Sequence, residues 1–319
     1  MTKFAKREYT LELITPAFLG GYDQSAEWRT AGMKALIRQW WRVVYVAEYG
    51  VNVAEMRRAE SLRFGVAAGP KDSLKAAVQI RFKKEPSSRT DKVSGIIKDQ
   101  TQSLQYLGFG PFVQPNIPTS RTALSAGGKV DLMILIRGAT DEECQKLREE
   151  IDQTMFLIHQ FGTIGSRANN GWGSLHVTGD LQFQELKRYG RKIEDCMRTD
   201  WKSAIATDNK GLMVWQTQAC ATADDAMKRL KHMRKEDQNI LAKQKGQRGL
   251  INGPFKNQNR WPNQFVLKVV KSGTQFKGQV SLLAHDWHEQ HVAQLPALLL
   301  AISASLDGAH TSFHRINSV

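Results

Sequence analysis

Cysteine is scarce in this chain. Its 319 residues include only three cysteines, Cys144, Cys196 and Cys220, which lie far apart and form no CxxC pair. This spacing argues against a disulfide framework and against a cysteine-rich zinc site. A reducing compartment, the cytoplasm, is the location that we expect.

Long apolar segments are also missing. The N-terminal sequence MTKFAKREYTLEL lacks the apolar core of a signal peptide, and the longest apolar run, around residues 297–302, is too short to cross a bilayer. We therefore expect neither a signal peptide nor a membrane partner. The hydrophobic share of 41% is ordinary for a globular protein, and the length suggests about two domains.

Acidic residues are outnumbered. The chain has 31 Asp and Glu against 45 Lys and Arg, a net charge of +14, which favours a polyanionic partner. Basic residues are concentrated at 81–98 and 228–248, and neither segment has a strong apolar face beside its basic one. This weakens the alternative of a membrane-surface or polyanion-sequestering protein. Nucleic acid remains the better candidate.

Hydrophobic periodicity predicts the order strand, helix, strand, strand, helix, strand, followed by a repeat of the same order. In the first half we expect strands at 8–14, 77–82, 129–137 and 174–177 and helices at 32–49 and 140–161. In the second half we expect strands at 212–217, 265–271, 278–284 and 311–316 and helices at 224–245 and 288–306. Thr140 and Glu143 form a capping-box sequence at one helix start.

The fold class expected from this order is α+β, with two tandem ferredoxin-like (RRM-like) βαββαβ domains. The first would span residues 1–180, with a basic insertion at 83–105 and a glycine-rich loop at 162–173. The second would span residues 181–319, with residues 180–209 as the connection.

The segment KALIRQWWR, residues 34–42, places three cations and two adjacent tryptophans together. On a helical wheel Trp40 falls on the apolar face and is expected in the core. Lys34, Arg38 and Arg42 are spaced four residues apart on another side, where they suit phosphate contacts. Trp41 lies beside them, and either packing on a neighbouring element or stacking on an arginine or a base is consistent with its position.

A second segment, FGTIGSRANNGWGSL at 161–175, holds four glycines around an arginine and two asparagines. Exposed backbone N–H groups together with Ser166 and Arg167 would suit a phosphate backbone. The segment is not a dinucleotide fingerprint, because it follows a helix, and it lacks the G-K-[ST] ending of a Walker loop. An ordinary connector with tight turns is the alternative.

The segments TPAFLGG, E-x-R, KALIRQWWR and FGTIGSRANNGWGSL together resemble the RAMP proteins of CRISPR systems, in particular the first-named RAMP subunit of type III-B Cmr effector complexes. The resemblance covers about residues 8–178. It implies paired ferredoxin-like domains and a place among the other subunits of an RNA-guided complex in antiviral defence. It also implies binding of guide RNA or its complementary target RNA, with no catalysis, cofactor or small-molecule substrate assigned to this subunit.

The RNA-binding residues expected from the resemblance follow its motifs. They are Gly20, Gly21, Arg29, Lys34, Arg38, Arg42, Gly165, Ser166, Arg167, Gly171, Trp172 and Gly173. Trp41, Asn169 and Asn170 join this set by position. The sequence departs from the family pattern at Ala35, where glycine is usual, and at the two asparagines, where a basic pair is common.

The main alternative is a RAMP-family endoribonuclease that cleaves guide precursor or target RNA. His159 lies among apolar residues and is expected to be packed, and Asp23 is a loop carboxylate without a partner for a divalent cation. In HDWHEQH the histidines at 285, 288 and 291 turn away from one another on a helix, unlike an HExxH zinc pair. We therefore expect no catalytic and no metal-binding residue.

Overall fold

The computed structural model describes residues 2–20, 25–66, 73–84, 89–92, 107–108, 122–243, 263–286, 295–308 and 312–316. The chain forms two compact units. The first comprises Met1–Lys92, Ser120–Ser166 and Gly173–Gln184, and the second comprises Val93–Thr119, Arg167–Trp172 and Glu185–Val319. The glycine-rich loop is thus divided between the units, whereas the sequence-based division at residue 180 assigns it to the first domain; that division stays a prediction.

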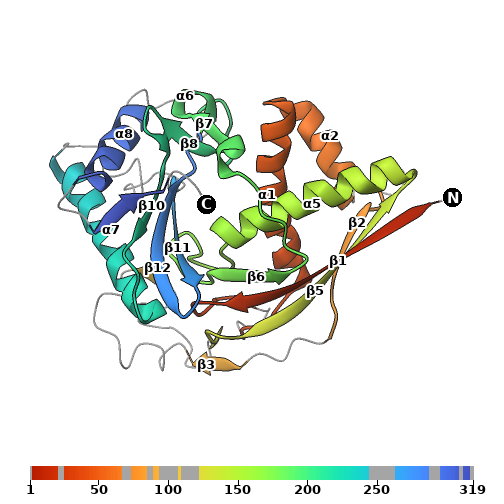
Figure 1. Ribbon diagram of the computed structural model, residues 1–319, viewed down its shortest axis with the longest axis horizontal. Coiled ribbons are helices and arrows are strands. Elements are labelled where there is room, and N and C mark those ends of the chain that lie inside the picture. Colours follow the sequence, from red (N-terminus) through yellow and green to blue (C-terminus); the bar gives the residue numbers. More distant parts are fainter. Residues whose placement is uncertain are drawn as a thin grey trace. The chain divides into compact units, whose positions relative to one another are not determined.

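The first unit is built on a four-stranded antiparallel sheet (Figure 1). Its strands β1 (Lys3–Leu13), β2 (Val78–Phe82), β5 (Lys129–Gly138) and β6 (Leu175–Gly179) lie in the order β2-β5-β1-β6. Alternate residues of β5 are buried from Val130 to Ile136, as the period of two in this segment predicts. Strands β3 (Thr90–Lys92) and β4 (Thr122–Leu124) form a separate two-stranded antiparallel sheet.

Three helices accompany this sheet: α1 (Thr30–Tyr49), α2 (Val53–Phe64) and α5 (Asp141–Phe161). Helix α5 packs on β1, β5 and β6, and α1 packs on α5 and β2. The predicted cap at the start of α5 is confirmed for Thr140, whose Oγ1 accepts a hydrogen bond from the Glu143 N–H at 3.2 Å; the Glu143 carboxylate accepts from the Ala139 N–H at 2.6 Å in place of the N–H of Thr140. Helix α2 was not predicted from the sequence.

The second unit contains a second antiparallel sheet with strands β10 (Val214–Thr217), β11 (Phe265–Ser272), β12 (Gln275–Leu282) and β13 (Phe313–Arg315). Their order is β11-β12-β10-β13. Helix α7 (Ala223–Lys243) packs on β11 and β12, and α8 (Leu295–Leu306) packs on α7. The turn between β11 and β12 contains Gly273, whose φ of 59° is one that glycine adopts readily.

The segment predicted as the connection, residues 180–209, contains helices and strands that were not predicted from the sequence. It folds into η1 (Leu186–Tyr189), β7 (Gly190–Lys192), α6 (Ile193–Cys196) and β8 (Ile205–Asp208), and β8 pairs with β9 (Gly211–Leu212). Together β7, β8 and β9 form a small three-stranded sheet. These elements are too short to give a periodic signal in the sequence.

The α+β class is confirmed, with antiparallel sheets and helices in both units. Most of the predicted insertion at 83–105, and the beginning of the helix predicted at 288–306, lie outside the described residues. All three cysteines are buried and free. Among the helices described, none has the length and apolar character needed to span a membrane.

Candidate nucleic-acid interface

Two glycine-containing segments of the first unit lie side by side although they are far apart in sequence. The carbonyl of Phe18 accepts a hydrogen bond from the Ser166 N–H at 2.9 Å. The carbonyl of Pro16 accepts one from the Gly173 N–H, also at 2.9 Å. The TPAFLGG segment is therefore paired with both ends of the glycine-rich loop.

The first turn of α1 joins the same place. A Cβ atom on Gly32 would lie 3.8 Å from the Ile164 side chain and 3.9 Å from that of Leu19. The turn therefore packs on the loop and on the TPAFLGG segment. Four of the predicted RNA-binding residues are exposed here: Gly20, Arg29, Gly165 and Ser166.

Two glycines of the loop lie where another stretch of backbone passes too close for a side chain. Gly165 has a φ of 98°, and a Cβ there would lie 2.9 Å from the Phe18 carbonyl oxygen. Gly173 has a φ of 63°, and its Cβ would lie only 1.9 Å from the Ile164 carbonyl oxygen. Both positions therefore need glycine for conformation and for space.

Three of the predicted RNA contacts in this loop find no support in the structure. Gly171 and Gly173 are buried, and Trp172 is only 2% exposed. An RNA strand cannot reach these residues while the loop keeps this conformation, because they pack inside the protein. The exposed part of the loop is limited to Gly165 and Ser166, followed by the half-buried residues 167–170.

The second half of the loop is tied to the second unit. The Asn169 carbonyl accepts a hydrogen bond from the Leu267 N–H on β11 at 2.9 Å, and its side-chain Oδ1 accepts one from Lys202 Nζ at 3.0 Å. Asn170 Nδ2 donates to the Leu107 carbonyl at 2.8 Å. Burial lowers the pKa of Lys202 to about 8. These bonds fix the orientation of both asparagine side chains, and their predicted contact with RNA stays a prediction.

Arg167 begins this half of the loop in an unusual conformation. Its φ is 62°, in the left-handed region that residues other than glycine rarely adopt. The side chain is half-buried. Its predicted contact with phosphate stays a prediction.

The predicted row of cations on α1 is organised around one carboxylate. Arg38 Nε donates to Glu60 Oε1 at 2.7 Å, and Arg42 donates through Nε and Nη2 to both carboxylate oxygens at 3.0–3.2 Å. The Glu60 side chain is 4% exposed, whereas Arg38 and Arg42 remain 39% and 32% exposed. Lys34, half-buried, makes no ion pair with any residue that the structure describes.

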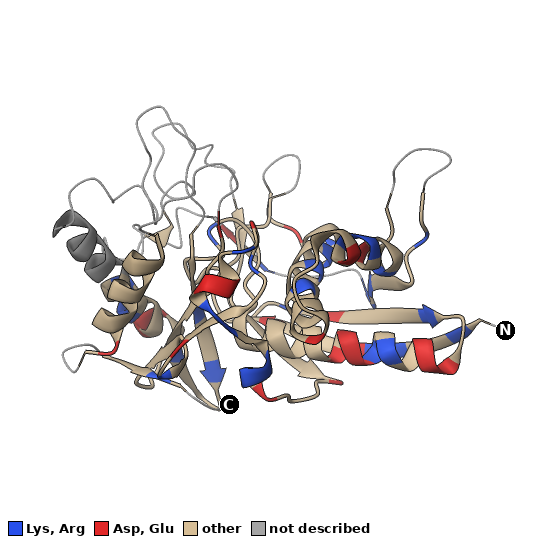
Figure 2. Cartoon of the chain, turned by 90° about the horizontal axis from the view of Figure 1, so that it is seen from above, with Lys and Arg blue, Asp and Glu red and all other residues tan. Residues whose placement is uncertain are grey.

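The charged side chains of α1 are all basic except for one acidic residue near the end of the helix. Three basic residues precede its one acid, Glu48, whereas α5 alternates between acidic and basic positions (Figure 2). Two guanidinium groups share the single charge of Glu60, which leaves a surplus of positive charge on this face. Glu60 itself was missed by the sequence analysis, because no local pattern links it to the arginines.

The N-terminus of α1 adds a second attraction for anions. Its first turn contains no acidic residue, and the side chain of its N-cap residue, Arg29, makes no capping hydrogen bond. The N–H groups of a first turn lack acceptors within the helix and form the positive end of its dipole. Arg29 is exposed and lies 3.4 Å from Glu27. A phosphate beside exposed Gly20 and Gly165 would meet this end of the helix.

Neither tryptophan of the α1 segment is exposed. Trp40 is 1% exposed and stacks on Phe161 with ring centroids 5.5 Å apart, which confirms its place in the core. Trp41 is also 1% exposed, and its Nε1 donates to Glu150 at 2.8 Å. The enclosed ring of Trp41 gives no support to its predicted contact with RNA and fits the alternative of packing on a neighbouring element.

The middle of the first sheet carries no aromatic ring on the face that points away from the helices. On the central strands β1 and β5 this face holds Glu8, Thr10 and Glu12, with Met133 opposite Glu8 and Asp131 opposite Thr10. The exposed aromatic ring of β1 on this face is Phe4, near the start of the strand, which is 73% exposed. Base stacking across the centre of a sheet, as in RRM proteins, does not fit the middle of these strands.

The candidate catalytic residues do not form a site in the described chain. His159 Nδ1 lies 3.0 Å from the Val177 carbonyl oxygen. His285 is 3% exposed, and burial lowers its pKa to about 4. Gly21, Asp23, His288 and His291 lie outside the described residues. No group of three or more His, Cys, Asp or Glu side chains that could hold a metal ion occurs among the residues described.

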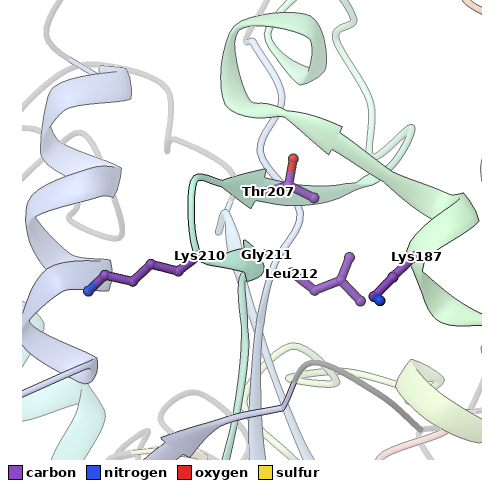
Figure 3. Close-up of a pocket in the computed structure, with 5 residues that line it drawn as sticks. All are labelled: Lys187, Thr207, Lys210, Gly211 and Leu212. Carbon is purple, nitrogen blue, oxygen red and sulfur yellow. The ribbon is translucent and has the colours of Figure 1, made fainter.

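A pocket in the second unit does not provide a better site. It has a volume of about 310 Å³ and is lined by Lys187, Thr207, Lys210, Gly211 and Leu212 (Figure 3). The Lys210 side chain points away from Leu212, and its amine pairs with Asp307 at 3.0 Å. Lys187 is then the one lining residue whose cation is directed to the pocket. A single cation does not identify the kind of ligand that the pocket could bind.

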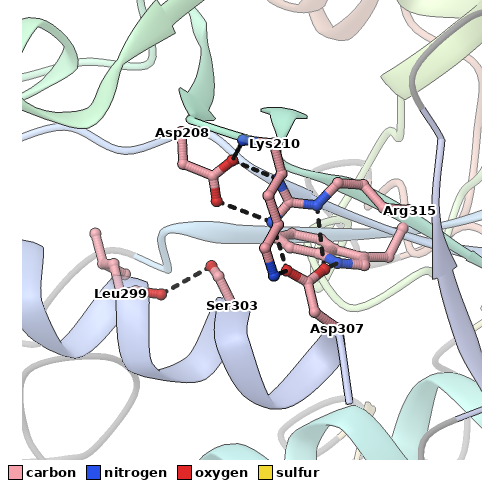
Figure 4. A network of polar contacts seen from close by, with 7 residues as sticks. Asp208, Lys210, Leu299, Ser303, Asp307 and Arg315 are labelled. Atoms are coloured by element: carbon pink, nitrogen blue, oxygen red, sulfur yellow. Dashed lines mark hydrogen bonds and ion pairs between the residues drawn. The ribbon is translucent and has the colours of Figure 1, made fainter. Parts of the chain in front are cut away.

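Next to this pocket lies a network of ion pairs with a structural role (Figure 4). Arg315 of β13 donates to Asp208 at 2.9 Å and to Asp307 at 3.0 Å, and Trp215 Nε1 donates to Asp307 at 2.8 Å. The Arg315 side chain is 8% exposed. The network joins β13 to the end of β8 and to the residue that follows α8.

Comparison with known proteins agrees with the family that the sequence motifs indicate. The model of the RAMP superfamily matches residues 10–176, which include the TPAFLGG segment, α1 and the whole glycine-rich loop. The chain belongs to the RAMP superfamily. The resemblance inferred from the sequence is therefore confirmed.

Proteins similar to this RAMP protein include a Cmr subunit and chains of two type III-B Cmr-beta structures. The CRISPR system Cmr subunit Cmr1-2 of Pyrococcus furiosus is 26% identical over 187 residues, 53% of this chain and 93% of that protein. A chain of type III-B Cmr-beta bound to cognate target RNA, solved by cryo-EM, matches with a TM-score of 0.55 at 10% identity, covering 94% of this chain and 99% of its own. A second Cmr-beta structure, with target RNA, AMPPnP and ssDNA present, matches with a TM-score of 0.50 at 10% identity over 94% and 98%. At these identities the structural matches bear on the fold alone.

Proposed function

We propose that this RAMP protein is a non-catalytic, RNA-binding subunit of a type III-B CRISPR effector complex. Its RNA would be the guide, the complementary target, or the duplex of the two, and its other partners would be further subunits of the complex. The similarity to Cmr1-2 and the fold shared with a chain of Cmr-beta bound to target RNA support this assignment.

The main support for RNA binding is that exposed backbone and a row of cations lie together at the start of α1. Exposed Gly20, Gly165 and Ser166 lie at the uncapped end of this helix, and the row of Lys34, Arg38 and Arg42 begins one turn further on. Successive cations of this row are about 6 Å apart along the helix axis. Exposed backbone beside a helix N-terminus and a line of cations suits a polyphosphate strand better than a single small anion.

The fold supports the proposal independently. In each four-stranded sheet the third strand lies between the second and the first, and the fourth pairs with the first on its other side. All pairings within these sheets are antiparallel. This is the strand order of a βαββαβ ferredoxin-like domain, and we infer two such domains in tandem.

Recognition of RNA at this site would be independent of base sequence. The groups available are guanidinium, ammonium and backbone N–H groups, which bind phosphate, and the buried tryptophans supply no surface for bases. In an RNA-guided complex base pairing reads the target, so a subunit that holds the guide must accept any sequence. Catalysis is not part of the proposal, because the described candidates His159 and His285 are engaged with backbone carbonyls.

The experiment uses the purified chain and two unrelated labelled single-stranded RNAs, incubated with Mg²⁺ or with EDTA. The proposal predicts binding of similar affinity to both RNAs, a steep dependence on salt and intact RNA after incubation. Cleavage that requires Mg²⁺ and persists through repeated purification would instead favour the endoribonuclease, beginning with Asp23. Binding of only one of the two RNAs would contradict a guide-holding role.

A further inference from the structure

Glu60 is an uncommon residue for the inward face of a surface helix. It belongs to α2, its side chain is 4% exposed, and both of its carboxylate oxygens are occupied by guanidinium groups from α1. A buried carboxylate requires such partners because its desolvation is costly. A smaller apolar residue would pack α2 on α1 without that cost, so the charge at this position calls for an explanation.

The geometry shows what the carboxylate does to the arginines. Arg42 uses Nε and Nη2, one edge of its guanidinium group, for Glu60, and Arg38 uses Nε. A guanidinium group has five N–H donors, so three on Arg42 and four on Arg38 are not taken by Glu60. The side chains that carry these donors are 32% and 39% exposed.

We propose that Glu60 is a positioning residue for RNA: it fixes the guanidinium groups of Arg38 and Arg42 one helical turn apart, with their remaining donors facing the bound phosphates. An arginine that is free in solution loses rotamer freedom when it binds phosphate, and an arginine already held by a carboxylate loses less. This role rests on the proposed RNA-binding function and adds α2 to the parts of the chain that build the site.

The effect of Glu60→Gln on RNA affinity distinguishes a positioning role from simple masking of positive charge, because the two roles predict changes of opposite sign. If Glu60 only masked positive charge, Glu60→Gln would raise the net charge at the site and tighten RNA binding. If it positions the arginines, Glu60→Gln weakens binding by about tenfold despite the added positive charge. Glu60→Asp keeps the charge but shortens the side chain by one methylene, and it too is expected to weaken binding.

The test is a double-mutant cycle measured with one labelled single-stranded RNA at fixed salt. Wild type, Glu60→Gln, Arg38→Ala/Arg42→Ala and the triple variant are compared after thermal unfolding and circular dichroism have shown that each is folded. Because Glu60 acts through the two arginines, Glu60→Gln should change the affinity less than about twofold once both are alanine. Tighter binding by Glu60→Gln, or an equal loss in both backgrounds, overturns the proposal. If Glu60→Gln does not fold, Glu60→Asp takes its place in the cycle, and unchanged affinity in that variant likewise overturns it.

Glu150 supplies the matched control. It is another carboxylate in the same helical layer, with its side chain 10% exposed, and it is bound by Arg63 and Trp41 and by neither of the two α1 arginines. Glu150→Gln should lower stability while RNA affinity stays within about twofold of wild type. Failure of the wild type to bind RNA, or unchanged binding by Arg38→Ala/Arg42→Ala, overturns the proposed function itself. Intact binding that depends on the arginines, with no effect of Glu60→Gln, overturns the role of Glu60 alone.

Discussion

The indole Nε1 of Trp41 donates a 2.8 Å hydrogen bond to the carboxylate of Glu150, which Arg63 also contacts through Nε and Nη2 at 2.8 and 2.7 Å. The guanidinium group of Arg63 lies 5.5 Å from the centroid of the Trp41 ring. These three residues come from α1, α5 and α2, so the second of the two adjacent tryptophans holds three helices together. Its position beside a basic row on the helical wheel does not bring it to the surface.

Trp41→Phe tests this assignment. The variant keeps most of the ring and removes the N–H donor, while Glu150 retains Arg63. Loss of a hydrogen bond to a charged acceptor should lower the free energy of unfolding by about 1–3 kcal/mol, as measured by urea denaturation. RNA affinity of the folded variant should stay within about twofold of wild type. A stable Trp41→Phe protein that no longer binds RNA would show that the indole is part of the interface.

Gly165→Ala should be costly for two separate reasons, and Gly127→Ala isolates one of them. Both glycines have positive φ, at 98° and 79°, so both variants carry conformational strain of about 1–2 kcal/mol. Only at Gly165 would the added Cβ also meet the Phe18 carbonyl oxygen, since nothing lies within 4 Å at Gly127. Gly165→Ala should therefore be the less stable variant in thermal unfolding by at least about 1 kcal/mol. Equal stability of the two would mean that the loop can move away from Phe18 at no cost.

The second unit should lose stability in acid through the ion pairs around Arg315. Burial alone would raise the pKa of the Asp208 and Asp307 carboxyl groups, but the hydrogen bond from Arg315 to Asp208, and those from Trp215, Lys210 and Arg315 to Asp307, lower both pKa values below the ordinary 3.8. A carboxyl group with a lowered folded-state pKa stabilises the fold fully above its unfolded-state pKa. That contribution is lost as the pH falls through the folded-state pKa.

Asp307→Asn is the variant that checks this dependence. Urea midpoints measured from pH 7 to pH 2.5 should fall more steeply below about pH 4 in the wild type than in Asp307→Asn, which is less stable at neutral pH and has one titrating group fewer. Parallel curves for the two proteins would show that Asp307 does not contribute to the acid sensitivity.

Elements with a strong hydrophobic period could be predicted from the sequence to within a residue or two. Strand β5, predicted at 129–137, is Lys129–Gly138, and α5, predicted at 140–161, is Asp141–Phe161. Helix α2 could not be predicted in this way. Its buried residues are only Met56, Glu60 and Phe64, and the charged residue in that set interrupts the apolar pattern. Its inward face is held by ion pairs whose partners lie on other helices.

The site was predictable where it depends on local spacing and unpredictable where it depends on distant partners. The cations of α1 follow from a period of four residues, and the structure brings Arg38 and Arg42 to one carboxylate. The burial of Trp41 depends on Glu150, 109 residues further along the chain. In the same way, the amide of Asn169 is engaged by Lys202, which no pattern around the glycine-rich loop indicates.

If the α1 cations bind the phosphates of RNA without reading its bases, the salt dependence of RNA binding must change in Arg38→Ala/Arg42→Ala. Affinities of wild type and variant for two unrelated single-stranded RNAs would be measured across a salt series. We expect a similar loss of affinity for both RNAs and a log–log salt slope that is flatter by up to about two units, one for each phosphate contact removed. An unchanged slope, or a loss confined to one RNA, would show that these arginines do not bind phosphate in this way.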